Sequence, residues 1–152
     1  MLPAEAIRAV ALVALALSAM VGWLSWRAVR LPPNDPNRLV AELRLAQLAA
    51  IVLACAAGAY IGLVAAAPAV PASGIDAALA LGFVMVAATA PLRDPREALT
   101  ILALAFLGHA LLDVLHRPGW LAEAVVPQWY ALGCAVQNVV VGALCYLPLL
   151  RR

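Results

Sequence analysis

The 152-residue sequence contains no lysine and little charge of any kind. All ten basic residues are arginines, only 12% of the residues are charged, and 66% are hydrophobic. A soluble domain carries about a quarter charged residues, and a soluble core of this size still leaves much of its surface in water. The composition therefore excludes a soluble globular protein. It predicts an integral membrane protein whose main partner is the lipid bilayer.

Several function classes lack the residues that they need. No basic run is long enough to follow a phosphate backbone, so we do not expect a nucleic-acid partner. The sequence also has no phosphate-binding glycine loop, no serine or cysteine nucleophile beside a base, and no paired-carboxylate hydrolase site. Cys55, Cys134 and Cys145 stand in apolar stretches and form no CxxC pair. We therefore expect them to be small buried residues rather than metal ligands or a redox pair.

Five apolar segments approach or exceed the roughly 20 residues that cross a bilayer. They cover about residues 6–26, 39–66, 75–90, 98–115 and 129–150, and proline-containing stretches separate them. Glu5 beside Arg8, together with the lack of a convincing Ala-x-Ala site, favours a retained first helix over a cleaved signal peptide. The sequence predicts an all-α, polytopic transmembrane bundle of five helices, in one membrane domain over residues 1–152.

The arginines are distributed unequally between the two sides of the predicted membrane. Eight of them fall on one side: Arg27, Arg30, Arg38, Arg44, Arg93, Arg96, Arg151 and Arg152. The positive-inside rule makes this side cytoplasmic, with the amino terminus outside and the carboxyl terminus in the cytoplasm. Abundant alanine and arginine without lysine indicate a GC-rich bacterial genome, and hence the bacterial inner membrane.

One polar stripe interrupts the fourth segment, in the octapeptide His-Ala-Leu-Leu-Asp-Val-Leu-His at 109–116. His109, Asp113 and His116 are spaced by four and then three residues, so they share one face of a helix. The stripe covers about 10 Å of depth, from the membrane interior to the exoplasmic surface. Because ionisable groups inside a bilayer are costly, the stripe is a candidate functional site.

Three chemical roles fit this stripe, beside a structural role in which its polar groups only satisfy one another. Two imidazoles and a carboxylate suit a divalent metal such as zinc, copper or non-haem iron. The same groups can carry protons, or a single histidine can ligate a haem. His109 and His116 lie two helical turns apart, so one ion does not easily reach both. Another helix must then complete a metal site.

The fifth segment offers supporting residues for the stripe. Cys134 and Asn138 share a helix face, and Gln137 lies beside that face. Amides in crossing membrane helices mostly form interhelical hydrogen bonds, and we expect the same of Gln47 in the second segment. Trp129 and Tyr130 are expected in the aromatic belt at the outer surface.

The second half of the chain resembles a group of small, uncharacterised bacterial multipass membrane proteins. Their pattern is a His-x3-Asp-x2-His helix, then Val-Pro-x-x-Tyr, then a helix with a Cys-x3-Asp-like element. The matching residues here are His109, Asp113 and His116, then Val126 to Tyr130, then Cys134 and Asn138. The resemblance covers roughly residues 95–145 and implies no particular activity. Asn138 departs from it, since an acidic residue is expected at that position.

Two main function classes remain open from the sequence, and it does not decide whether the protein is an enzyme. In the first, the stripe is a metal- or haem-binding site of a membrane enzyme or carrier, and proton or ion handling is a further alternative. In the second, the chain is a non-catalytic accessory subunit of a larger membrane complex. A homo-oligomer is compatible with both classes.

Overall fold

The computed structural model describes residues 4–66, 73–115 and 126–151, and these residues are almost entirely helical. The elements are α1 (Ala4–Arg30), α2 (Pro36–Ala66), α3 (Ser73–Thr89), the 3-10 turn η1 (Ala90–Leu92), α4 (Pro95–Leu115), α5 (Gln128–Tyr146) and the 3-10 turn η2 (Leu147–Leu150). Five candidate spans are long and apolar enough to cross a membrane, and no described residue lies in a strand. The predicted all-α bundle of five helices is confirmed, and it supports a multipass membrane protein.

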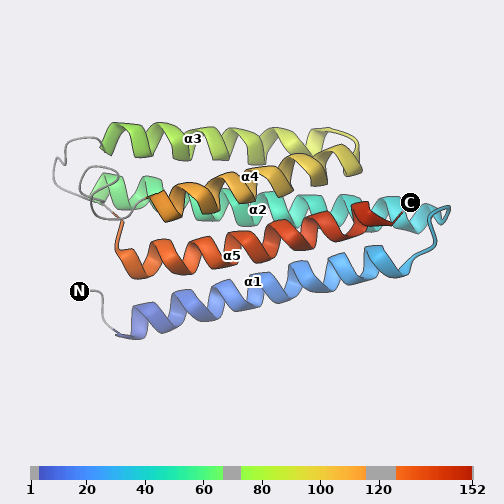
Figure 1. Cartoon of the computed structure of the whole chain (residues 1–152), viewed down its shortest axis with the longest axis horizontal. Coiled ribbons are helices and arrows are strands. Elements are labelled where there is room, and N and C mark those ends of the chain that lie inside the picture. Colours follow the sequence, from blue (N-terminus) through green and yellow to red (C-terminus); the bar gives the residue numbers. More distant parts are fainter. Residues whose placement is uncertain (1–3, 67–72, 116–125, 152) are drawn as a thin grey trace.

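The five helices run side by side along the length of the molecule (Figure 1). Helix α4 makes its most extensive contact with α5, and α2 makes its most extensive contact with α3. Helix α1 packs mainly on α2 and α5, and it lies at the opposite edge of the bundle from α3 (Figure 1). Helix α1 begins at one end of the bundle and η2 lies at the other (Figure 1), as an odd number of crossings requires.

Two Asp-Pro pairs set the starts of α2 and α4. The Asp35 carboxylate accepts a hydrogen bond of 2.8 Å from the backbone N–H of Asn37, and Asp94 accepts one of 3.0 Å from Arg96. An aspartate at the cap satisfies an otherwise unpaired N–H of the first turn. The proline that follows has no N–H to satisfy and already holds a helical φ angle. Both helices therefore start at proline, three residues before the predicted apolar segments.

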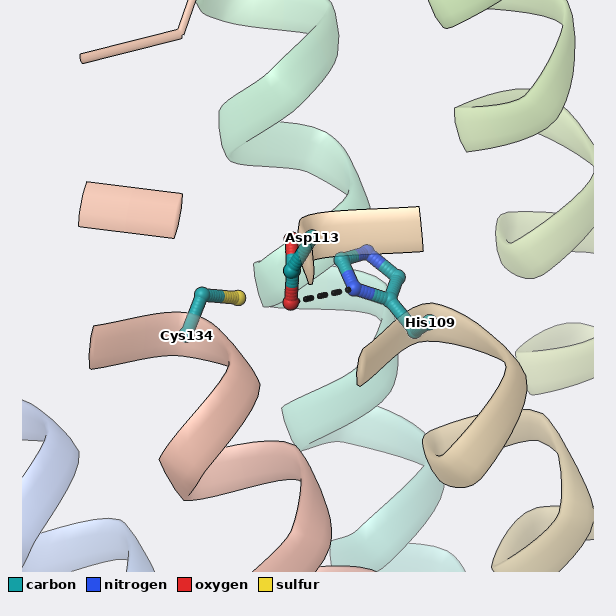
Figure 2. Close-up of side chains that lie close together, drawn as sticks. All are labelled: His109, Asp113 and Cys134. Carbon is teal, nitrogen blue, oxygen red and sulfur yellow. Dashed lines mark hydrogen bonds and ion pairs between the residues drawn. The ribbon is translucent and has the colours of Figure 1, made fainter. Parts of the chain in front are cut away.

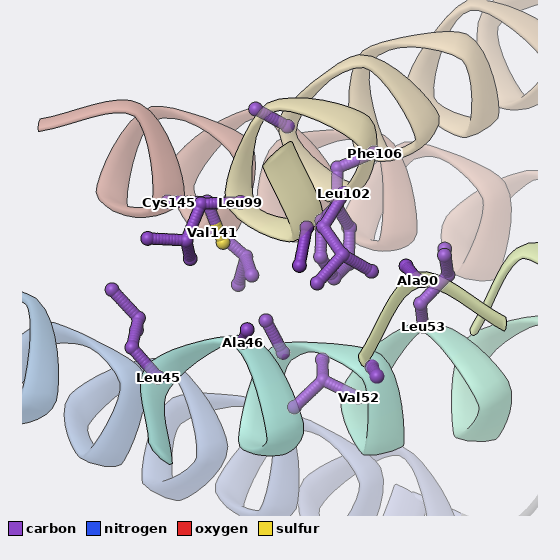
Figure 3. Packing of buried hydrophobic residues seen from close by; sticks show 14 of the residues in the cluster. Leu45, Ala46, Val52, Leu53, Ala90, Leu99, Leu102, Phe106, Val141 and Cys145 are labelled. Carbon is purple, nitrogen blue, oxygen red and sulfur yellow. The ribbon is translucent and has the colours of Figure 1, made fainter. Parts of the chain in front are cut away.

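The core of the bundle consists largely of alanine and leucine (Figure 3). Leu45 and Leu53 of α2 face Leu99 and Leu102 of α4, and all four are fully buried. Small alanines let the helix backbones approach, while the larger side chains fill the space between them. The outer surface is also apolar, as expected for a surface that contacts lipid rather than water. Leu15 is 67% exposed, for example.

Helices α4 and α5 approach each other closely at Gly142. A Cβ atom at this glycine would stand 3.2 Å from the Phe106 Cβ and 3.3 Å from the carbonyl oxygen of Ala103. Both distances are shorter than ordinary van der Waals contacts, so only a glycine fits here without a shift. This contact sets how closely the polar faces of α4 and α5 meet.

An ion cluster of Arg38, Glu42 and Arg96 is located at the arginine-rich end of the bundle. Arg38 Nε lies 3.0 Å from Glu42 Oε1, and both side chains are almost completely buried. Arg96 Nη1 lies 3.5 Å from the same oxygen. Arg38 also donates hydrogen bonds to the carbonyl oxygens of Pro148 and Arg151, just where η2 ends. Carbonyls at a helix end are unpaired and carry partial negative charge, so the cluster fastens the carboxyl-terminal segment to the bundle.

Two sequence expectations about polar residues do not agree with the structure. Cys55 was expected to be buried, but its side chain lies exposed on the surface of α2. Gln47 is likewise exposed rather than directed toward another helix. The apolar character of a membrane segment does not reveal which of its faces contacts lipid, since both the interior and the surface are apolar.

Candidate functional site

A buried polar cluster joins three helices at the arginine-poor end of the bundle. It consists of Tyr60 on α2, His109 and Asp113 on α4, and Cys134 and Asn138 on α5. His109, Asp113 and Asn138 are 3%, 2% and 1% exposed, so all three are shielded from the surroundings. Buried polar groups are stable only when they bond to one another. The pairings within this polar cluster therefore determine its chemistry.

Asp113 is the centre of the polar cluster. Its Oδ1 accepts a hydrogen bond from the Tyr60 hydroxyl, which comes from a different helix. Its Oδ2 accepts one of 2.9 Å from Asn138 Nδ2 and lies 3.2 Å from His109 Nδ1. The spacing of four residues between His109 and Asp113 produces this last contact within α4, as the helical repeat predicts. Both carboxylate oxygens thus have partners.

The Asn138 amide contacts three acceptor atoms at once. Its Nδ2 lies 2.9 Å from His109 Nδ1, 2.9 Å from Asp113 Oδ2 and 3.3 Å from Cys134 Sγ. An amide nitrogen carries only two hydrogens, so it cannot donate a full hydrogen bond to all three. Which of the three atoms accepts from Asn138 depends on where the imidazole and thiol protons lie.

His109 can hold its ring proton in two places. When Nδ1 accepts a hydrogen bond from Asn138, the proton lies on Nε2. When Nδ1 carries the proton, it can donate to Asp113 Oδ2 instead. Two aromatic rings hold the imidazole in position, with centroid distances of 5.4 Å to Tyr60 and 4.7 Å to Phe83.

A small cavity of about 10 Å³ adjoins the imidazole, between α2, α3 and α4. Tyr60, Asp76, His109 and Asp113 contribute its polar lining. A space of this size holds about one water molecule. The polar cluster can therefore contain a water, whereas the described residues leave no room for a haem beside His109.

Figure 2 shows His109, Asp113 and Cys134 converging on one point from α4 and α5. One ligand atom from each of these residues lies within 4.8 Å of the other two, and all three residues are buried. An imidazole nitrogen, a carboxylate oxygen and a thiol sulfur are the ligand types that bind zinc in proteins. The arrangement offers a three-ligand set contributed by two helices.

The structure places the candidates from the sequence differently with respect to this polar cluster. His109, Asp113, Cys134 and Asn138 belong to it, whereas His116 lies outside the described residues. Gln137 is half-buried beside it and is not one of its hydrogen-bond partners. Trp129 and Tyr130 stack edge to face at 5.8 Å, and the Tyr130 ring lies 6.0 Å from that of Tyr60.

Sequence reasoning missed Tyr60 as a member of the polar cluster. Its signal was a tyrosine near the outer end of the second segment, where an aromatic belt is also expected. A belt tyrosine keeps its hydroxyl in the headgroup region, but Tyr60 is 5% exposed and directs its hydroxyl to Asp113. Only the position of α2 beside α4 distinguishes the two roles.

No protein-family model matches this chain, and no curated protein or solved structure matches it. The chemistry of the polar cluster is therefore inferred from its own atoms. Among the described residues, Asp113 has a single ion-pair partner, His109, which is charged only when protonated. A buried carboxylate is costly without a positive partner. The Asp113 carboxyl therefore offers an oxygen that a cation can bind.

Proposed function

We propose that this chain is a bacterial inner-membrane protein that binds a divalent transition metal within its helix bundle. The ligands are His109, Asp113 and Cys134. The observation that carries the proposal is the convergence of three different ligand atoms, all within 4.8 Å of one another in a buried site. The arginine distribution supports an orientation with this site near the exoplasmic surface.

The ligand types favour zinc or a similar borderline metal. A thiolate and an imidazole select such metals over magnesium or calcium, which prefer oxygen ligands. The metal would also supply the positive charge that Asp113 lacks, because binding converts an uncompensated carboxylate into a ligand. Loss of the Cys134 thiol proton would accompany binding, so affinity should rise with pH.

Asn138 occupies the place where the three ligand atoms meet. Its Nδ2 lies 2.9 Å from His109 Nδ1, 2.9 Å from Asp113 Oδ2 and 3.3 Å from Cys134 Sγ. Rotation of the amide would present the oxygen in place of the nitrogen and supply a fourth, neutral ligand. Asn138 is therefore expected to support the proposed metal site or to supply a ligand to it. His116 stays a candidate ligand.

Metal analysis of the purified protein tests this proposal. Wild-type protein in mild detergent should contain stoichiometric metal, and Cys134→Ser and His109→Ala should lose it. Cys145→Ser is the matched control, since Cys145 is also a buried thiol of α5 but lies in the apolar core. Cobalt replacement gives a second readout, because a sulfur-to-metal charge-transfer band should appear in wild type and in Cys145→Ser and be absent from Cys134→Ser. A Cys134→Ser protein that retains its metal would contradict the proposal.

Proton handling is a second candidate, and the Tyr60–Asp113–His109 chain favours it. Each of these three side chains can hold or pass a proton, and they are linked by direct contacts. The test uses metal-free protein in vesicles loaded with a pH-sensitive dye. Under this function His109→Gln should slow proton passage, whereas Cys134→Ser should not. If the protein instead binds a metal, Cys134→Ser should abolish metal binding.

A further inference from the structure

A second feature lies at the opposite end of the molecule from the polar cluster, between α1 and the carboxyl-terminal turn. An open groove of about 320 Å³ runs along the surface there. Gly22 and Val29 of α1 form one wall, and Leu144, Leu147 and Leu150 form the other. The groove is lined almost entirely by apolar side chains, so water is a poor occupant.

The floor of the groove is closed and its polar groups are satisfied. Ser25 is 1% exposed and donates a hydrogen bond of 2.6 Å to the carbonyl oxygen of Leu144. This bond joins α1 to α5 beneath the groove. The groove therefore lies between two helices that a hydrogen bond connects, and it opens to the outer surface of the bundle.

Positive charge marks the arginine-rich end of the groove. Arg151 is exposed, lines the groove, and donates one hydrogen bond of 3.1 Å to the carbonyl oxygen of Val29. This bond holds the guanidinium in place and uses one of its five N–H groups, which leaves others for an anion. Arg30 stands 4.7 Å from the ring centroid of Trp26, a wall residue. None of the described residues that line the groove is acidic.

We infer that the groove binds one anionic phospholipid from the arginine-rich leaflet. Its acyl chain lies in the apolar groove, and its phosphate contacts Arg151 and Arg30. Trp26 lies between these two regions, which suits an indole at the boundary between acyl chains and headgroups. Basic pockets between membrane helices select anionic lipids in this way, because a fixed guanidinium pairs with the phosphate at low dielectric. This site is independent of the proposed metal centre.

Native mass spectrometry with defined lipids tests the inference. Purified protein is mixed with equal amounts of phosphatidylglycerol and phosphatidylcholine that carry the same acyl chains. We expect wild-type protein to retain phosphatidylglycerol preferentially. Arg151→Gln and Arg30→Gln should each lower this preference about fivefold, which corresponds to ~1 kcal/mol for each arginine near the headgroups. Because Arg30 makes no described hydrogen bond to the backbone, its variant tests charge without loosening the fold.

A matched control and a steric variant make the test specific. Arg93→Gln removes an exposed arginine from the same end of the bundle, but Arg93 pairs with Glu97 outside the groove, so this variant should retain the wild-type preference. Gly22→Leu should reduce retention of both lipids by filling the groove, since its first added atom meets Leu144 at an ordinary 3.7 Å. Equal retention of the two lipids by wild-type protein would overturn the inference. Equal losses in Arg93→Gln and Arg30→Gln, or full competition by soluble glycerol phosphate, would also overturn it.

Discussion

Asn138 on α5 donates a hydrogen bond of 2.9 Å to Asp113 on α4, across the most extensively packed pair of helices in the bundle. The same amide nitrogen lies equally close to His109. One neutral side chain thus holds together the acid and the base of the polar cluster. The amide is neutral, so it does not balance the charge of a carboxylate at Asp113.

Asn138→Asp should strengthen the dependence of stability on metal. Without metal, two carboxylates would face each other at this contact, and their repulsion should lower the melting temperature. With zinc, the second carboxylate becomes a ligand, and the variant should gain more stability from metal than wild type does. Thermal unfolding in detergent, with zinc and with a chelator, measures both effects.

Gln137→Glu is the control for that experiment. It adds the same charge one residue away, outside the hydrogen bonds of the polar cluster. It should gain no extra stability from zinc. An equal gain in thermal stability in the two variants would show that zinc stabilises any added negative charge on α5. The effect would then not be specific to the polar cluster.

Tyr60→Phe should destabilise the bundle without changing its shape. The variant keeps the ring but removes the hydroxyl that donates to Asp113, and so leaves a buried carboxylate oxygen without its partner. Such a loss costs about 1–3 kcal/mol in free energy of unfolding. Tyr146→Phe removes a hydroxyl from a tyrosine that is 51% exposed, and it should have little effect. Equal unfolding curves for the two variants would show that the Tyr60 contact contributes nothing.

Gly142→Ala should loosen the contact between α4 and α5. The added methyl group would press on Phe106 and on the backbone of Ala103, and overpacking of this kind costs about 1–3 kcal/mol. Gly133→Ala, on the same helix, has open space within 4 Å of its new Cβ and should be neutral or slightly stabilising. Unfolding of both variants in denaturant measures the difference. A stable Gly142→Ala protein would show that the helices separate at little cost.

Glu42→Gln should release the carboxyl-terminal segment. The variant leaves the buried Arg38 guanidinium without its carboxylate, and breaking a buried pair costs about 3–5 kcal/mol. Glu97→Gln disrupts an exposed pair with Arg93 and should cost at most about 1 kcal/mol. Protease cleavage near Arg151 should become faster only in Glu42→Gln. Similar cleavage of wild type and Glu42→Gln would contradict the fastening role.

The orientation in the membrane can be tested with reporter fusions. A reporter after Arg152 should be active on the cytoplasmic side, because eight arginines mark that side. A reporter fused after Ala66, past the second crossing, should report the exoplasmic side. Exoplasmic activity at Arg152 would invert the predicted topology, and it would place the polar cluster near the cytoplasm.

Much of the fold followed from the sequence because it depends on local properties. Uninterrupted apolar runs require helices, since a bilayer offers no water to satisfy the backbone. The Asp-Pro pairs at 35–36 and 94–95 set two helix starts through contacts within three residues. The spacing of four residues likewise predicted that His109 would meet Asp113, and that Cys134 and Asn138 would share a face.

Tertiary structure alone decided which faces meet. The Tyr60 contact to Asp113 spans 53 residues and the Asn138 contact spans 25, and no helical period relates these positions. The sequence does not predict the ion cluster, because Arg38 and Glu42 resemble ordinary interfacial charges. Only the packing of η2 over them distinguishes the two cases. In a bundle that is apolar inside and outside, burial cannot be read from hydropathy. The fit of small residues such as Gly142 against neighbouring helices selects the inward faces, and this selection turned separate polar residues into one cluster.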